Sequence, residues 1–300
     1  MQFFGKTYFN FLKYRKVFLI LSVVLIVAGF IISAVIGLDY GIDFEGGTEL
    51  SVKFEKPINT DRIRQAVEEL GIEGAEIKSF GSVTQYMIRI KQSAKTPKEV
   101  GEAIDQAIPE IKMTVLQMNQ IGPKIGSELR TQAIIAIVLA LVALLIYVAF
   151  RFEFIYGCGA VIAIIHDIVV TFTIALILHN LGIVNMEINL TFLAAMLTVM
   201  GYSINATVIV FDRMRENREY SRDKSIVEIA NSSINETLSR TVITVGTTLI
   251  VLVVLIIFGG AVLKPFAVVM TLGVVIGVYS SIYISTSFVC WAFERKQLKK

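Results

Sequence analysis

The stretch that decides the fold is residues 17–38, which read VFLILSVVLIVAGFIISAVIGL. It carries no charged side chain, and roughly 20 apolar residues in a helix are enough to cross a hydrocarbon core about 30 Å thick. Four basic residues, Lys6, Lys13, Arg15 and Lys16, precede it as they would in a signal peptide. A cleavable signal has an apolar run of only about 7–15 residues, so we interpret this stretch as a retained membrane anchor.

Five more apolar stretches follow the first one. The 300 residues are 55% hydrophobic, with a mean hydropathy of +0.69, which leaves too little polar surface for a soluble protein. The sequence therefore predicts an α-helical polytopic membrane protein. Its six spans are predicted at residues 17–38, 133–150, 155–179, 190–211, 242–258 and 266–292. The second and the fifth are short, and flanking residues can extend them.

Basic side chains gather on one side of the predicted spans, and this sets the expected orientation. Four segments are basic: the N-terminus, the connection between the second and third spans, the connection between the fourth and fifth, and the C-terminal tail. With six spans, all four fall on the same side, which the positive-inside rule assigns to the cytoplasm. Both termini are therefore predicted to be cytoplasmic in the plasma (inner) membrane. Beyond the N-terminal residues, the basic side chains are Arg151, Arg213, Arg215, Arg218, Arg222, Lys224, Arg295, Lys296, Lys299 and Lys300.

Between the first two spans, the sequence changes to the pattern of a soluble domain, predicted to be extracytoplasmic. Four segments alternate like strands, and two repeat apolar residues at helical spacing, as Ile63, Ala66, Val67 and Leu70 do. The order strand, helix, strand, strand, helix, strand is that of a ferredoxin-like α+β (βαββαβ) fold. The strands are predicted at 48–54, 75–80, 84–91 and 113–118, and the helices at 60–70 and 97–108.

The chain is thus predicted to have four parts. Residues 1–38 form the cytoplasmic N-terminus and the first span, and residues 39–122 form the inserted domain. Residues 123–292 hold the second to sixth spans, and residues 293–300 form the cytoplasmic tail.

Charge and composition exclude several classes of function. Residues 39–130 hold 12 Lys and Arg against 15 Asp and Glu, so the inserted domain lacks the basic face that nucleic-acid binding needs. The domain holds no histidine, no cysteine and no phosphate-binding glycine pattern. Cys158 and Cys290 lie in apolar stretches and are expected to behave as small apolar residues rather than as disulfide partners. The sequence predicts no enzyme, no catalytic residue, no metal and no cofactor.

A few polar residues lie inside the predicted spans, where a charged side chain costs about 2.5–3.5 kcal/mol on insertion. His166 and Asp167 lie near the middle of the third span, and Asn205 lies in the fourth. Arg240, preceded by Glu236, lies at the start of the fifth. Four threonines of the fifth helix share one face, namely Thr237, Thr241, Thr244 and Thr248.

Two interpretations of these polar residues stay open. In the first, they form a proton relay, in which a carboxylate or an imidazole changes charge and releases or captures an arginine, which favours one packing of the helices. The ion-coupling candidates are then Arg240, Asp167, His166, Asn205, Thr244 and Thr248. In the second, they are polar contacts between helices, and the arginine extends to the cytoplasmic headgroups. The spacing of Gly273, Gly277 and Ser281 predicts a close-packing seam on the sixth span.

Four groups of residues carry a resemblance to a known family. They are DFEGGT at 43–48; GYSIN at 201–205 followed by VFDRMREN at 210–217; TLSRT at 237–241 with Thr247 and Thr248; and His166 with Asp167. In this combination the chain resembles the SecD/SecF family of protein-export membrane proteins, of the resistance-nodulation-division superfamily, and within it the SecF branch. The resemblance covers nearly the whole chain, in order, with the same six-span layout. The family signature falls on Asp43, Gly46, Gly47, Gly201, Asp212 and Arg213.

The resemblance implies a protein-export subunit that pairs with SecD in a twelve-span, pseudo-symmetric unit. That unit associates with the SecYEG channel, and often with YajC and YidC, within the lipid membrane. It helps secretory preproteins to leave on the outer side by using the proton motive force, or sodium in some relatives. The inserted domain is then the moving part that holds or releases emerging chains, and Arg240 falls on the family's functionally important arginine.

One position departs from the family pattern. The family usually has Asn-Asp-Thr where this chain has Asn205-Ala206-Thr207, and the family's Asp is associated with ion coupling. An alanine cannot bind a proton. Either coupling rests on a SecD carboxylate together with Asp167, or the sequence is an engineered variant, or the subunit supports assembly without driving ion flow.

Two other classes of function compete with protein export. A small-molecule exporter of the same superfamily usually carries twelve spans and two large outer domains in one chain, twice what this chain has. An enzyme with an intramembrane His–Asp site would need a placed nucleophile or a second group of metal ligands, and the sequence contains neither.

Overall fold

The computed structural model describes residues 8–72, 75–79, 82–90, 96–184, 186–221 and 223–298. The predicted basic residues Lys6, Arg222, Lys299 and Lys300, and the predicted strand ends at Phe80 and Lys91, lie outside the described residues.

The chain forms two compact units. The helical unit comprises Met1–Gly37, Ile137–Met186 and Thr191–Lys300. The sheet unit comprises Leu38–Ala136 and the short segment Glu187–Leu190. Three residues of the connection between the third and fourth spans, and the first residue of the fourth span, therefore belong to the sheet unit.

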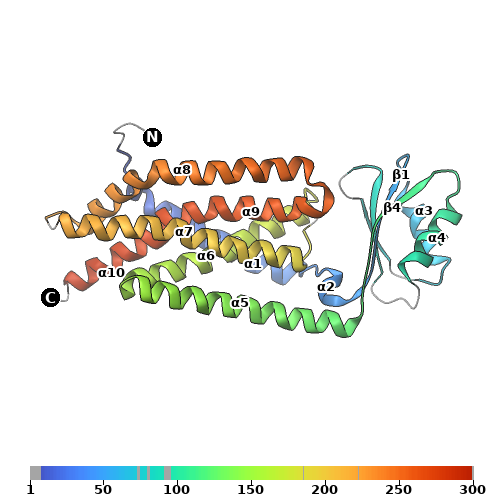
Figure 1. Ribbon diagram of the computed structural model, residues 1–300, viewed down its shortest axis with the longest axis horizontal. Helices are drawn as coiled ribbons and strands as arrows, with labels where there is room; N and C mark the ends of the chain where they lie inside the picture. Colours follow the sequence, from blue (N-terminus) through green and yellow to red (C-terminus); the bar gives the residue numbers. More distant parts are fainter. Residues whose placement is uncertain are drawn as a thin grey trace. The chain divides into compact units, whose positions relative to one another are not determined.

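Within the described ranges, six helices are long and apolar enough to cross a membrane, which confirms the predicted polytopic architecture (Figure 1). The first joins the 3-10 turn Phe11–Tyr14 to α1 (Arg15–Ile36). The next four are α5 (Pro123–Arg151), α6 (Phe154–Asn180), α7 (Leu190–Tyr220) and α8 (Ile226–Phe258). The sixth combines α9 (Gly260–Ser280), a π-helical turn at Ser281–Ser285, and α10 (Thr286–Leu298).

Two helices begin well before the predicted start of their span, and α7 continues to Tyr220, beyond the predicted end at residue 211. α5 begins at Pro123 rather than at residue 133, and α8 begins at Ile226 rather than at residue 242. The added turns of α8 are polar, so a search for apolar stretches does not find them. A capping box starts this helix, because Ser225 Oγ accepts from the N–H of Glu228 and the Glu228 carboxylate accepts from the N–H of Ser225. Arg240 therefore lies inside α8 and not at the beginning of a helix, and its place at the start of the apolar part of the fifth span stays a prediction.

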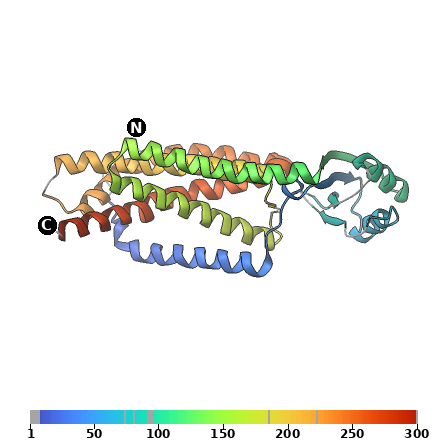
Figure 2. The same ribbon diagram turned by 90° about the horizontal axis from the view of Figure 1, so that it is seen from below.

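The core of the helical unit consists of α6, α7 and the sixth span. Their apolar windows are 50%, 44% and 56% buried within the chain, against 11% for the first span, 6% for α5 and 11% for α8. Within this core, the ring of Tyr156 on α6 packs edge-to-face on Phe211 of α7 and at a tilt on Phe293 of α10. Figure 1 shows α8 running beside α9, and Figure 2 shows α1 along one margin of the unit. The peripheral helices thus leave broad apolar faces exposed.

Small residues on α9 let α7 approach closely. A Cβ atom added to Gly273 would lie 2.1 Å from Cγ2 of Val199, and one added to Gly277 would lie 3.2 Å from Cα of Ser203. The predicted close-packing seam is confirmed at both glycines. It brings α9 against the part of α7 that carries Ser203.

The sheet unit contains four antiparallel strands in the order β2-β3-β1-β4. The elements follow as β1 (Gly47–Phe54), α3 (Thr60–Glu68), β2 (Glu76–Ser79), β3 (Gln85–Ile90), α4 (Pro97–Ala107) and β4 (Met113–Ile121). Leu50 and Val52 of β1 pair with Ile88 and Tyr86 of β3, and all four side chains are buried. With Ile63 of α3 they belong to one apolar core. Figure 1 shows α3 and α4 on the same face of the sheet.

A single helical turn, α2 (Ile42–Glu45), and two glycines lead into β1. Gly46 and Gly47 have φ of 77° and 134°, values that L side chains rarely adopt. A Cβ atom on Gly46 would also lie 2.9 Å from Cα of Pro123, the first residue of α5. The two glycines therefore let the chain that enters the sheet unit pass close to the chain that leaves it.

Candidate functional site

Asp167 is the centre of a buried hydrogen-bond network that joins four helices. Its side chain is 1% exposed. Its Oδ1 lies 2.8 Å from Nδ1 of His166, and its Oδ2 accepts from the hydroxyls of Ser203 on α7 and Ser280 on α9, at 2.5 and 2.7 Å. A carboxylate surrounded by donors in this way can exist inside a bilayer, where an isolated charge would be excluded.

The network continues from His166 towards α1. The imidazole Nε2 lies 2.8 Å from Oγ of Ser22, and Ser22 Oγ lies 2.7 Å from the hydroxyl of Tyr279. Tyr279 donates in turn to the carbonyl of Phe18, at 2.6 Å. A continuous polar chain therefore runs from Asp167 to the backbone of α1.

Counting the hydrogen-bond donors shows how many protons this series of hydrogen-bonded side chains needs. Each hydroxyl has one proton to donate. If Tyr279 donates to Phe18 and Ser22 donates to Tyr279, then His166 must donate to Ser22 from Nε2. One further proton must then lie between His166 Nδ1 and Asp167 Oδ1, because two unprotonated acceptors would repel each other there. In this state the pair of His166 and Asp167 carries no net charge.

Loss of that shared proton changes the hydrogen bonds further along. The one remaining imidazole proton is needed at Nδ1, facing Asp167, so Nε2 must accept from Ser22. Ser22 then no longer donates to Tyr279, and one hydrogen bond between α1 and α9 is lost. The network can therefore convert the presence or absence of one proton into a change in the contact between two spans.

The sixth span leaves α-helical geometry directly after Ser280. In the π-helical turn, the carbonyl of Ser281 accepts from the hydroxyls of Ser285 and Thr286, at 3.0 and 2.6 Å. Such turns inside α-helices are frequent at functional sites. Here the turn begins at the residue after Ser280, which donates a hydrogen bond to Asp167. This part of the span is therefore a candidate for rearrangement.

The other candidate residues form a separate, exposed polar face on α7 and α8. Asn205 and Arg240 are exposed, and Thr244 and Thr248 are half-buried. Thr248 hydrogen-bonds to Tyr202 of α7, at 2.9 Å, and so joins the two helices. Among the residues that the structure describes, the Arg240 guanidinium has no ion-pair or hydrogen-bond partner. The structure thus brings His166 and Asp167 together but does not bring Arg240 or Asn205 to them.

The predicted threonine face of α8 mostly bonds to its own helix. Thr237 donates to the carbonyl of Ser233, Thr241 to that of Thr237, and Thr248 to that of Thr244, all one turn earlier. Such bonds satisfy a hydroxyl without reaching a neighbouring helix.

Three of the family-signature residues, Asp43, Asp212 and Arg213, join different helices. Asp43 accepts from the N–H of Leu190, the first residue of α7, at 2.9 Å, where a carboxylate also suits the positive end of the helix. Asp212 pairs with Arg151 of α5 at 2.8 Å, and Arg213 pairs with Glu236 of α8. Gly201 is exposed on the same face of α7 as Asn205.

The sequence did not predict that segment 187–190 forms hydrogen bonds and an ion pair within the sheet unit. The N–H of Gly41 donates to Ile188 and the N–H of Ile188 donates to Asp39, both at 2.9 Å, in a parallel bridge. Glu187 is an ion-pair partner of Arg89 on β3. These four residues lead directly into α7, so the sheet unit holds the start of the span that carries Ser203.

Arg89 is the centre of an ionic cluster in the sheet unit. Its side chain is 3% exposed and faces four carboxylates, those of Asp39, Glu49, Glu76 and Glu187. Lys78 pairs with Asp39, Glu76 and Glu187. Two cations thus serve four carboxylates. Burial raises the pKa of Glu49, although Arg89 beside it acts in the opposite direction. The signal for this cluster in the sequence is an arginine between Ile88 and Ile90 in a buried strand.

No group of three His, Cys, Asp or Glu side chains that could hold a metal ion occurs among the described residues. Cys158 and Cys290 are both free thiols, and Cys290 is buried.

Two family models match the chain. "Protein export membrane protein SecD/SecF, C-terminal" matches residues 100–295, and "SecD/SecF GG Motif" matches residues 31–58. The second range contains Gly46 and Gly47, the glycines that precede β1.

Named proteins with similar sequences come from several bacteria. The chain is 40% identical over 287 residues to "Protein translocase subunit SecF" of Calditerrivibrio nitroreducens, which covers 93% of this chain and 92% of that protein. It is 39% identical over 282 residues to the protein of the same name from Vibrio alginolyticus, covering 93% of this chain and 88% of the other.

A solved structure has the same fold. It is that of SecDF from Thermus thermophilus, described as a translocon-associated membrane protein, with a TM-score of 0.86 and 32% sequence identity. The similarity covers 97% of this chain and 39% of the SecDF chain. The present chain therefore spans about two fifths of that larger protein.

Proposed function

Because this chain belongs to the SecD/SecF family of protein-export membrane proteins, we propose that it couples ion flow through its spans to the export of secretory preproteins. Within protein export, the chain acts as a SecF subunit, like its named relatives. Its relatives are named translocase subunits, which favours this role over that of a small-molecule exporter. The ion is a proton, with sodium as the second candidate.

The observation that carries the proposal is the network around Asp167. It contains a shared proton site, between His166 and Asp167, and a chain of hydroxyls that reaches α1. Binding of a proton favours the contact between α1 and α9 through Ser22 and Tyr279, and its release weakens that contact. The helices thereby exchange between two packings, in step with the proton.

The exposed polar face of α7 and α8 supports a companion subunit. An arginine and an asparagine facing lipid would be costly, so Arg240 and Asn205 need a protein surface to cover them. SecD is the companion that the family provides. We infer that a carboxylate of SecD faces Arg240 and takes the place of the carboxylate that Ala206 cannot supply. SecYEG, YajC and YidC are further proposed partners.

The sheet unit is the proposed extracytoplasmic part, and both termini are proposed to be cytoplasmic. Its element order and its antiparallel strand order support a ferredoxin-like fold. The backbone hydrogen bonds of Ile188 with Gly41 and Asp39 attach the residues that precede α7 to this domain. A change in the packing of α7 is therefore passed to the domain that meets emerging preproteins.

The test is ion-dependent export in vesicles that contain this chain, SecD and SecYEG. A proton gradient is expected to speed the late stage of preprotein export, and Asp167→Asn is expected to abolish this stimulation. The asparagine keeps the shape and an acceptor but cannot bind the proton. Glu294→Gln, at the end of the sixth span, serves as the control and should keep the stimulation.

Arg240→Met tests the exposed face in the same vesicles. It is expected to reduce the stimulation and to weaken the association with SecD. Replacing the proton gradient by a sodium gradient identifies the ion. If Asp167→Asn and Arg240→Met both respond to the gradient as the unmodified chain does, the proposed coupling site is wrong.

A further inference from the structure

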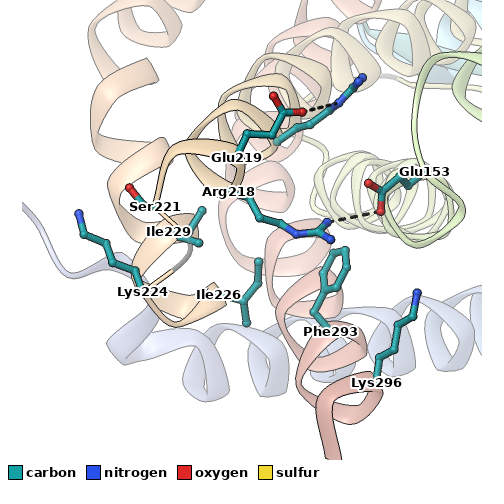
Figure 3. Close-up of a pocket in the computed structure, with 10 residues that line it drawn as sticks. Glu153, Arg218, Glu219, Ser221, Lys224, Ile226, Ile229, Phe293 and Lys296 are labelled. Carbon is teal, nitrogen blue, oxygen red and sulfur yellow. Dashed lines mark hydrogen bonds and ion pairs between the residues drawn. The ribbon is translucent and has the colours of Figure 1, made fainter. Parts of the chain in front are cut away.

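A second polar site lies at the end of the helical unit where α6 and α8 begin and α7 and α10 end. The turn between α8 and α9, at Gly259, is at the opposite end. It is a pocket of about 520 Å³ (Figure 3). Figure 3 shows Arg218 at its centre, with Lys224 and Lys296 on either side of it. The network around Asp167 contributes none of the lining residues.

The arginines of the pocket are already paired. Arg218 lies 3.4 Å from the carboxylate of Glu153, and its guanidinium stacks 4.3 Å from the ring centre of Phe293. Arg215 lies 3.8 Å from the carboxylate of Glu219. The two carboxylates that line the pocket are therefore both engaged by arginine.

The two lysines of the pocket have no such partner. In the described part of the chain, no carboxylate lies within ion-pair distance of the ammonium group of Lys224 or Lys296. Four cations and two carboxylates line the pocket, which leaves an excess of two positive charges. A ligand with a compact negative charge would complete this arrangement.

Apolar side chains form part of the same wall. Ile226 and Ile229 of α8 line the pocket beside Phe293. An inorganic anion gains nothing from such a surface, whereas the first carbons of a lipid tail would pack on it. The lining thus suits a molecule that has an anionic head and an apolar body.

The pocket is lined by residues at the ends of helices. Glu153 immediately precedes α6, Ile226 is the first residue of α8, and Lys296 lies in the last turn of α10. Nearby, Trp291 is 48% exposed and Tyr220 is 82% exposed. Tryptophan and tyrosine concentrate at the membrane–water interface, which favours a pocket at the depth of the bilayer phosphates.

We propose that this pocket binds the phosphate of an anionic phospholipid of the cytoplasmic leaflet. The phosphate lies between Lys224 and Lys296, and the glycerol and first tail carbons lie on Ile226, Ile229 and Phe293. Basic pockets between spans on the cytoplasmic side are a known way to bind such headgroups. The bound lipid would join the ends of α7, α8 and α10 at the membrane surface.

The test compares lipids retained by the purified full-length chain in detergent, measured by native mass spectrometry. Dioleoyl phosphatidylglycerol is the anionic probe, and dioleoyl phosphatidylcholine is the zwitterionic one. Each lysine near an anionic headgroup contributes about fivefold in affinity, so Lys224→Ala with Lys296→Ala is expected to weaken phosphatidylglycerol binding about 25-fold. Binding of phosphatidylcholine should change little.

A matched control removes two charges from the same end of the helical unit. Lys13 and Lys16 lie at the start of the first span, which is held to α8 by a hydrogen bond from the N–H of Phe11 to Asn231. Lys13→Ala with Lys16→Ala should leave phosphatidylglycerol binding unchanged. Lys224→Arg with Lys296→Arg keeps the charge and should retain the affinity for phosphatidylglycerol. Unchanged phosphatidylcholine binding by the double alanine variant would show that this variant is still folded.

Three results would overturn the proposal. Equal loss of lipid in the two double alanine variants would make the binding a property of surface charge. Displacement of the lipid by millimolar inorganic phosphate would make the pocket a site for free phosphate. Unchanged lipid binding with loss of SecD from the purified complex would make it a protein contact.

Discussion

The imidazole of His166 is tied to α1, because its Nε2 lies 2.8 Å from the hydroxyl of Ser22. The apolar window of this first span is only 11% buried, and hydrogen bonds tie the span to α6 and α9. Three hydrogen bonds of the network that starts at Asp167 reach this span: His166 to Ser22, Ser22 to Tyr279, and Tyr279 to the Phe18 carbonyl. A change at Asp167 can therefore reach the first span through His166 and Ser22.

Ser22→Ala is expected to uncouple α1 from the proton at Asp167. The substitution removes both hydrogen bonds of the Ser22 hydroxyl, one to His166 and one to Tyr279. Each contributes about 1 kcal/mol, and their loss interrupts the hydrogen-bonded path between His166 and Tyr279. In the unmodified chain, hydrogen exchange of the α1 amides, corrected for intrinsic rates, should be faster at a pH where the pair has lost its proton. In Ser22→Ala this pH-dependent difference should disappear.

Ser33→Ala is the control for that measurement. Ser33 lies on the same helix and donates to the carbonyl of Gly29 within it, at 2.7 Å. It should keep the pH-dependent exchange of α1. A difference that persists in Ser22→Ala as well would contradict a role for the hydroxyl chain.

Ala206→Asp is expected to increase the stimulation of export by a proton gradient. Ala206 is half-buried on α7, between exposed Asn205 and buried Thr207, and the Thr207 hydroxyl has no hydrogen-bond partner in the described part of the chain. A new carboxylate would add a second proton site and a partner for that hydroxyl. Because an Asp in a span costs about 2.5–3.5 kcal/mol on insertion, export should be normalised to the amount of inserted chain.

Ala206→Asn tests whether the effect of Ala206→Asp comes from its titratable carboxylate or only from the polarity of the new side chain. It offers similar hydrogen bonds without a titratable group, so it should leave the stimulation at the level of the unmodified chain. Equal export in the Asp and Asn variants would mean that coupling in this chain does not depend on position 206.

Apolar runs and helix or strand periodicity could be recognised in the sequence, whereas contacts between segments distant in the sequence could not. The spans follow from apolar length, and the strands and helices of the sheet unit begin within a residue or so of their predicted starts. His166 and Asp167 stood out because charged groups are rare in spans. Ser22, Ser203 and Ser280 did not, because a serine in a span commonly bonds to its own helix. Only packing brings these three hydroxyls to one carboxylate.

Local irregularities were also beyond reach of the sequence patterns. The helix α2 has a single turn and therefore no periodicity to detect. The π-helical turn at Ser281–Ser285 replaces one hydrogen-bond register by another without a distinctive residue type. The polar start of α8 shows no apolar run, and its capping box becomes significant only when the helix is known to continue to Arg240.

Arg89→Met is expected to destabilise the sheet unit by about 3–5 kcal/mol, because it leaves buried carboxylates without their cation. Arg89 is 3% exposed and faces Glu49 and Glu187, which are themselves largely buried. Hydrogen exchange of the β1 and β3 amides in the full-length chain measures the loss. The amides of the segment 187–190 should lose protection at the same time.

Lys78→Met is the matched control, since Lys78 pairs with Asp39 and Glu76 of the same cluster but is 31% exposed. An exposed ion pair contributes at most about 1 kcal/mol, so the protection of β1 and β3 should change little. Comparable losses in both variants would mean that burial of Arg89 does not set its contribution.

Glu49→Gln is expected to remove part of the pH dependence of the sheet unit. Burial raises the pKa of Glu49 in the folded chain, so the folded state holds this proton more tightly than the unfolded state does. The free energy of unfolding is then highest below the ordinary pKa of a glutamic acid, about 4.3. It falls as the pH rises through the folded pKa, and the penalty remains at neutral pH. Hydrogen exchange of β1 and β3, corrected for intrinsic rates, should show this fall in the unmodified chain and a smaller one in Glu49→Gln. A larger fall in Glu49→Gln would mean that the attraction of Arg89 for the Glu49 carboxylate outweighs the cost of burying it.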